Sequence, residues 1–127
     1  MATRPTFVDT EVLYAEQANE LATAIIAPNN QVGTTYTFVL ADDGKIITMN
    51  NAASITATIP PNSSVAFGIG TQLNIFQYGA GTVTITAGAG VTLYSDGSKF
   101  KTNAQYAIAT AVKIATNIWA VCGNLKA

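Results

Sequence analysis

From about residue 33 onward the sequence alternates apolar and polar residues in short runs, and this alternation constrains the fold more than any other feature. In "ASITATIP", Ile55, Ala57 and Ile59 fall on one face of an extended chain, while Ser and Thr residues fall on the other. A period of two is typical of a half-buried β-strand. Roughly eight or nine such runs follow one another at the spacing typical of sandwiches and barrels. Because no helix is predicted between them, we expect antiparallel pairing and an all-β fold, either an antiparallel β-sandwich or a jelly-roll-like barrel.

Turn-forming residues separate the runs and indicate how neighbouring strands connect. "DDG" at 42–44 lies between "TTYTFVLA" and "KIITMN", and it predicts a hairpin. "GAG" occurs at 79–81 and again at 88–90, and we interpret both copies as turns. In "QYAIATAVKIA" the alanines fall on one face, and the other face carries the large residues Tyr106, Ile108, Val112 and Ile114.

Residues 1–32 follow a different pattern and form a predicted N-terminal arm ahead of a β-domain at 33–127. Between about residues 15 and 26, Ala, Leu and Ile recur at three- and four-residue spacings, which predicts a short helix with one apolar face. Pro28 ends this helix because proline disfavours helical geometry at the residue before it. "PNNQVG" is then interpreted as a turn-rich linker. A helix of this length is marginal alone, so we expect it to pack on the β-domain or on a neighbouring chain.

The middle of the chain is free of charge, since Asp, Glu, Lys and Arg are all absent between Ile46 and Ser95. Only 10% of the whole sequence is charged, against about 25% in typical domains. Exposed neutral strands are prone to aggregate edge to edge. One explanation is that Thr, Ser, Asn and Gln make the outer faces soluble enough, because Thr also suits strands. The other, which we favour, is that copies of the chain cover much of this surface, since charges are depleted at interface cores.

The charge balance and the apolar runs limit the partners that the chain can have. A net charge of −1 creates no field that would attract nucleic acid or anionic lipid. No apolar run reaches the ~18 residues of a membrane span, and no signal-peptide pattern follows Arg4. We therefore expect neither a nucleic-acid partner nor a membrane, and synthesis in a reducing cytoplasm. The single cysteine, Cys122, lies in the apolar run "NIWAVCGN" and is predicted to be buried and inert.

The residue types that most catalytic and metal sites need are missing. The sequence has no histidine, which removes the commonest general base and a usual zinc ligand. Asp42 and Asp43 lie in the "DDG" turn with too few oxygen ligands nearby for calcium. Nothing in the spacing requires Asp42 and Asp96 to form a pair for glycoside cleavage. We therefore predict no enzymatic activity, no cofactor and no metal, which leaves a structural or binding module.

Three residues are candidates for contacts with a partner or a glycan, namely Tyr94, Lys99 and Lys101. A tyrosine ring can stack on a sugar, and the two lysines, at alternate positions of one strand, can contact an acidic partner. The alternative is that the lysines protect a solvated strand edge. For most of the aromatic residues, Tyr94 and Trp119 among them, packing in the core is the favoured interpretation, because they fall at periodic positions beside aliphatic residues.

Several ordered motifs resemble a β-domain that recurs in virion proteins of tailed bacteriophages. The matching pieces are "YTFVLADDGK", "MNN", "IPPNS" and "GTQLNIFQYGAG", and the ending "AQYAIATAVKIATNIWAVCGNL" is also similar. The likeness covers about residues 36–125. It implies a non-enzymatic virion component that is assembled in many copies, and from the kind of family we expect a homotrimer.

The front segment has a resemblance of its own. "FVDTEVLYAEQANEL" is similar to the opening of many phage tail-fibre and baseplate-associated proteins, although Thr10 stands where glycine is usual and Ala18 replaces a leucine. With Ile25 added from the predicted helix, this likeness implies an assembly arm whose candidate residues are Phe7, Leu13, Ala15, Asn19, Leu21 and Ile25. We expect the arm to contact the major capsid protein, another virion protein or a neighbouring subunit.

The resemblance and the charge pattern together lead to one expected function and two alternatives. We expect a bacteriophage capsid decoration (cement) protein, located in the virion, that stabilises the head shell and forms exposed knobs. The first alternative is a short tail-fibre, baseplate or collar component. The second, from another class, is a carbohydrate-binding module that contacts a host-surface glycan through exposed aromatic rings.

Overall fold

The computed structural model describes residues 27–127, and this part of the chain is built from strands in two mixed β-sheets. The expectation of an all-β fold is confirmed for these residues. The predicted helix at about 15–26 lies outside them, as do the candidate arm residues Phe7, Leu13, Ala15, Asn19, Leu21 and Ile25.

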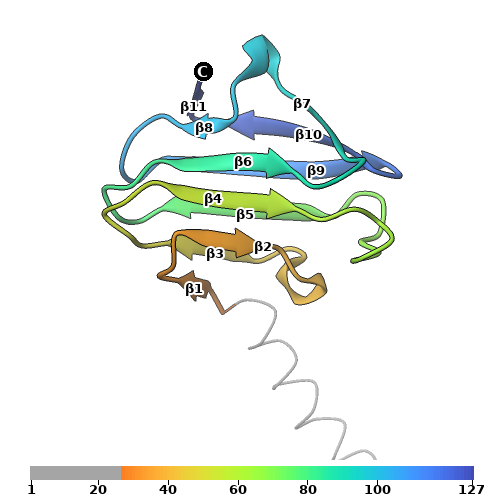
Figure 1. Cartoon of the computed structure of the whole chain (residues 1–127), viewed down its shortest axis with the longest axis horizontal. Helices are drawn as coiled ribbons and strands as arrows, with labels where there is room; N and C mark the ends of the chain where they lie inside the picture. Colours follow the sequence, from red (N-terminus) through yellow and green to blue (C-terminus); the bar gives the residue numbers. More distant parts are fainter. Residues whose placement is uncertain (1–26) are drawn as a thin grey trace, which may run out of the picture.

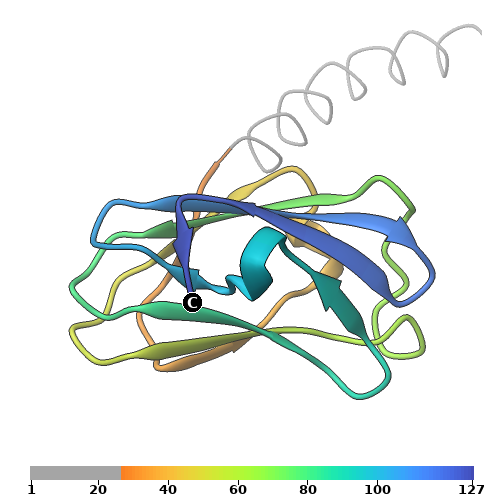
Figure 2. The same cartoon turned by 90° about the horizontal axis from the view of Figure 1, so that it is seen from above.

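The two sheets lie face to face as two layers (Figures 1 and 2). Sheet A has six strands, in the spatial order β1 (Asn29–Gln31), β3 (Ile46–Met49), β5 (Gln72–Gln77), β9 (Ile108–Ala115), β10 (Ile118–Gly123) and β7 (Thr92–Tyr94). Sheet B has five strands, in the order β11 (Leu125–Lys126), β8 (Lys101–Thr102), β6 (Val83–Ala87), β4 (Ile55–Ile59) and β2 (Thr35–Thr37). Two short 3₁₀ helices lie in the connections, η1 (Leu40–Asp42) and η2 (Asp96–Ser98).

Consecutive strands alternate between the sheets from β1 to β8, and this alternation produces parallel pairing. β1, β3 and β5 pair in parallel in sheet A, and β2, β4 and β6 do so in sheet B. Five of the nine strand pairings are parallel, so the expectation of antiparallel pairing is wrong for these five. Each connection crosses to the opposite sheet, and the following strand returns the chain in its original direction. The opposite sheet thus supplies the crossover for which a parallel pair often uses a helix.

Two local expectations, a hairpin at the "DDG" turn and a linker at 28–33, are wrong. The "DDG" turn does not close a hairpin, because β2 lies in sheet B and β3 in sheet A, and η1 carries the chain between them. The predicted linker at 28–33 contains β1, which pairs with β3. Sheet A therefore begins before the predicted domain boundary at residue 33.

Antiparallel pairing does occur in the hairpin of β9 and β10, which lies between β5 and β7 in sheet A. β9 pairs antiparallel with β5 on its other side. The hairpin turn contains Asn117 with φ 58°, a left-handed conformation that asparagine adopts more readily than most residues. Beyond the hairpin, β7 pairs in parallel with β10, so β7 runs in the same direction as β5.

The core fills the space between the sheets and uses the alternate residues that the sequence predicted. Ile55, Ala57 and Ile59 of β4 are all buried. Trp119 packs edge to face on Phe67, with ring centroids 5.5 Å apart. The core cluster further includes Phe38, Ile47, Met49, Leu73, Ile75, Val83, Ile85, Ala109, Ala111 and Val121.

Both "GAG" segments are turns, and each contains a glycine that lies against a neighbouring connection. A Cβ on Gly81 would lie 1.9 Å from the carbonyl oxygen of Ala53. A Cβ on Gly88 would lie 2.7 Å from the carbonyl oxygen of Ile59. Only glycine allows the stacked connections to approach so closely, so these turns fix the spacing between successive pairs of strands.

Candidate interaction surfaces

The outer face of sheet B is a regular array of threonines. Thr35, Thr56 and Thr84 lie side by side on β2, β4 and β6, and Thr37, Thr58 and Thr86 form a second row two residues further along. The first row continues to Lys101 on β8, which in turn pairs with Lys126 on β11. Hydroxyl groups on this face bond to water, and the branched side chains suit strands. The solubility of this face therefore needs no covering partner.

The outer face of sheet A carries no charge and combines polar residues, such as Gln72, Asn74 and Thr110, with a group of large apolar side chains. We define the apolar face by seven large side chains that point outward from β5, β7 and β9 or from the residues next to these strands. Five of them are exposed, namely Tyr78, Tyr94, Tyr106, Ile108 and Ile114. The other two, Phe76 and Val112, are half-buried. Exposed large apolar side chains that gather on one face mark interaction sites more often than single scattered ones do. The apolar face is therefore the leading candidate for a functional surface.

One end of the apolar face is a cluster of three aromatic rings. Phe76 and Tyr78 pack edge to face with centroids 5.7 Å apart, and Phe76 stacks on Tyr106 at 6.1 Å with an interplanar angle of 23°. The backbone of Tyr106 has φ 73°, a left-handed conformation that costs about 1–3 kcal/mol in a non-glycine residue. Its amide donates a hydrogen bond to the Gln77 carbonyl at 2.7 Å. This backbone bond holds a strained residue whose side chain is 63% exposed.

The strand β9 places its large side chains outward and its small ones inward. Ala109 and Ala111 are fully buried, whereas Ile108 is 47% exposed and Ile114 is 51% exposed. The predicted alternation is confirmed, and the structure shows that the alanine face is the one that meets the core. Small inward residues leave room for Trp119, which belongs to the same core cluster.

Lys113 is the only charged residue in the six strands of sheet A, and its side chain points into the protein. It is 3% exposed, and its Nζ donates to Asn62 Oδ1 and to the Phe67 carbonyl, both at 2.7 Å. A buried ammonium needs such acceptors because its desolvation is costly. The outward positions of the sheet A strands consequently carry no charge.

A second buried charged residue is Asp42, which is hydrogen-bonded to side chains of β1 and β2. Asp42 is 1% exposed and accepts hydrogen bonds from Tyr36 Oη at 2.6 Å, Asn29 Nδ2 at 2.8 Å and the Val39 amide at 3.0 Å. Burial, and then the hydrogen bond and the charge of Asp42, raise the pKa of Tyr36 well above its usual value. The "DDG" aspartate therefore organises a structural network in addition to a turn.

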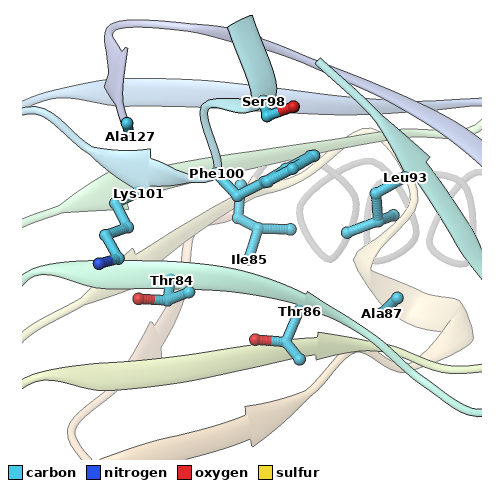
Figure 3. A pocket seen from close by; sticks show the side chains of 9 residues that line it. All are labelled: Thr84, Ile85, Thr86, Ala87, Leu93, Ser98, Phe100, Lys101 and Ala127. Atoms are coloured by element: carbon cyan, nitrogen blue, oxygen red, sulfur yellow. The ribbon is translucent and has the colours of Figure 1, made fainter.

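The three candidate contact residues do not come together in one site. Tyr94 is 59% exposed on β7 in sheet A, while Lys101 lies on β8 in sheet B. Lys99 lines a hollow with Asp96 and Cys122. The side chain of Lys101 instead lines a different groove, between β6, β7 and η2 (Figure 3).

That groove has a volume of about 420 Å³ and an apolar floor formed by Ile85, Leu93 and Phe100. It exists because β8 is only two residues long and pairs with β6 at Thr84 alone. Threonine and serine hydroxyls line its rim (Figure 3). No titratable pair of the kind that catalysis needs lines it among the residues described.

One expectation about a single residue is wrong and another is confirmed. Cys122 is exposed rather than buried, because it takes an outward position on β10 next to the buried Val121. Trp119 is 1% exposed and packs in the core as expected, so it is not available to stack on a sugar. Within residues 27–127 no group of three or more Cys, Asp or Glu residues could hold a metal ion, and no helix is long and apolar enough to cross a membrane.

Comparisons of this chain with protein-family models, with curated proteins and with solved structures returned no match.

Proposed function

We propose that the protein is a structural subunit of a bacteriophage virion, and specifically a capsid decoration protein that stabilises the head shell as a homotrimer. In this proposal residues 27–127, which include β1, form a β-sandwich or jelly-roll-like knob, and residues 1–26 form the arm that contacts the major capsid protein or another virion protein. The motif resemblance in the sequence supports the phage assignment.

The observation that carries the structural role is the uncharged outer face of sheet A. Five of its large apolar side chains are exposed, and no Asp, Glu, Lys or Arg points outward from its strands. Such a surface is unfavourable in a solitary protein and normal in a subunit that neighbours cover. A repeated subunit of a shell is the role in which every copy finds such neighbours.

The experiment is to determine how many copies of the chain a purified phage particle carries and where they lie. Immunogold labelling and quantitative mass spectrometry should show labelled heads and a copy number comparable to that of the major capsid protein. Labelled tails with few copies would favour the tail-fibre, baseplate or collar alternative. Particles that lack the protein would refute a virion role of either kind.

A carbohydrate-binding module is the second candidate function, because the cluster of Phe76, Tyr78 and Tyr106 offers rings on which a sugar could stack. A glycan array probed with the full chain tests it. Binding that is lost on Tyr106→Ala and retained on Thr56→Ala would support this function. Complete absence of binding to host-surface polysaccharide would remove it.

A further inference from the structure

The outer faces of the two sheets differ, and each has its own reason for carrying so little charge. We infer that the apolar face of sheet A is the surface on which copies of this chain meet, while the threonine face of sheet B stays in water. This inference rests on the proposed function, because it names the partner and the surface that a self-assembling virion subunit would use.

The strand β9 carries the first argument. A strand that only had to cover a core would bury its isoleucines and expose its small residues. β9 does the reverse, since Ala109 and Ala111 are fully buried while Ile108 and Ile114 are about half exposed. Burial of these exposed isoleucines can contribute favourable free energy only when another molecule covers them.

Charge identifies the kind of partner. The only charged residue in the strands of sheet A is the inward-pointing Lys113. Two such faces can approach each other without like-charge repulsion and without removing an ion from water. A strongly charged partner would lose hydration against this face and find no opposite charge there. A second copy of the same neutral face meets neither difficulty.

The area of the sheet sets the scale of the contact. Six strands spaced by ~4.8 Å, with about five residues of ~3.3 Å each, give a flat sheet of roughly 500 Å², of which the apolar face on β5, β7 and β9 is one part. A stable interface buries about 600–1,000 Å² of accessible surface on each partner, so the contact must extend beyond the apolar side chains to the rest of the sheet and the adjoining connections. In a trimer, the apolar faces of three copies would turn toward the common axis, so that each copy contacts two others.

A pair of matched variants tests the inference. Ile108→Lys adds a positive charge to the apolar face next to its aromatic cluster, and Thr56→Lys adds the same charge to the exposed face of the interior strand β4. Sedimentation velocity of the full chain over a range of concentrations should show an oligomer for the wild type and for Thr56→Lys. Ile108→Lys should weaken the association at least tenfold, because the loss of a hot-spot residue reduces the affinity of an interface by more than a factor of ten.

The native thiol provides a second readout that needs no folded variant. Cys122 is exposed on the same side of sheet A, paired with Thr110 of β9. Its reaction with a maleimide should slow as the wild-type protein is concentrated, because association covers it. This measurement decides the question if Ile108→Lys does not fold, as judged by its thermal transition.

Several results would overturn the inference. They are an unchanged oligomer in Ile108→Lys, dissociation in Thr56→Lys, a thiol rate that does not depend on concentration, and a wild-type monomer at all concentrations. A monomer whose glycan binding is lost in Ile108→Lys would assign the face to a carbohydrate instead. The virion role is tested separately by the copy number on particles, so an oligomer that uses another face would refute the inference and leave the proposed function standing.

Discussion

The replacement of Asp42 by alanine should be one of the most destabilising single changes in the β-domain. The carboxylate is buried and accepts three hydrogen bonds, from a phenol, a side-chain amide and a backbone amide. Hydrogen bonds to a charged group contribute about 1.5–3 kcal/mol each, and removal of the carboxylate also removes its own desolvation cost. Val39 is half exposed, so water can reach its amide in the variant. We expect a net loss of about 3 kcal/mol, mainly because the Tyr36 hydroxyl and the Asn29 amide each lose their bond to the carboxylate and keep the bond to each other.

The assay is urea denaturation followed by tryptophan fluorescence, since the buried Trp119 is the only tryptophan. Asp43→Ala is the matched control, because Asp43 is the adjacent acid and is exposed. The control should stay within about 0.5 kcal/mol of the wild type. A decrease in the free energy of unfolding below about 1 kcal/mol in Asp42→Ala, or equal decreases in both variants, would refute the view that this hydrogen-bond network stabilises the fold.

Four further outcomes follow from the structure. Burial and Asp42 raise the pKa of Tyr36, so the stability that this phenol contributes should be complete below about pH 10 and should decrease above it. Tyr36→Phe should abolish that decrease in alkaline urea titrations, and a decrease that persists unchanged in the variant would contradict the assignment. Gly81→Ala should cost more than about 2 kcal/mol, since its Cβ would overlap the Ala53 carbonyl; a variant that melts within a degree or two of the wild type would count against the close stacking of the turns. Ala109→Leu should destabilise by about 1–3 kcal/mol through overpacking, whereas Ile108→Leu should change the stability little; equal costs would argue against the inward alanine face. Deletion of residues 1–26 should release the protein from particles while circular dichroism still shows a folded β-domain; full occupancy by the truncated protein would refute the proposed arm.

Residue patterns predicted the strands well where one face meets the core and the other meets water. The period of two in β4 places Ile55, Ala57 and Ile59 inward, and the structure confirms it. The same pattern cannot specify which strands pair, because alternation is the same for parallel and antiparallel neighbours. The alternation of β2 and β3 between the two sheets depends on contacts far apart in the sequence, such as Gly81 against Ala53.

The candidate surface was only partly predictable. The charge-free stretch indicated a covered surface, but the sequence did not distinguish the threonine face of sheet B from the apolar face of sheet A. In β9 both faces are mostly apolar, so the inward choice of alanine over isoleucine depends on the volume left by Trp119 and its neighbours. The outward position of Cys122 follows from the same strand parity, since Trp119 and Val121 take the inward positions of β10. The exposure of Cys122 could have been anticipated by treating "IWAVCG" as an alternating strand instead of an apolar block.

The mass of the full chain in dilute solution tests most directly the central claim that other copies of the chain cover the uncharged face of sheet A. Sedimentation equilibrium at physiological salt should give a multiple of the 13.2 kDa chain mass, with three copies expected. A single species of 13.2 kDa that persists up to the highest soluble concentration would contradict the account.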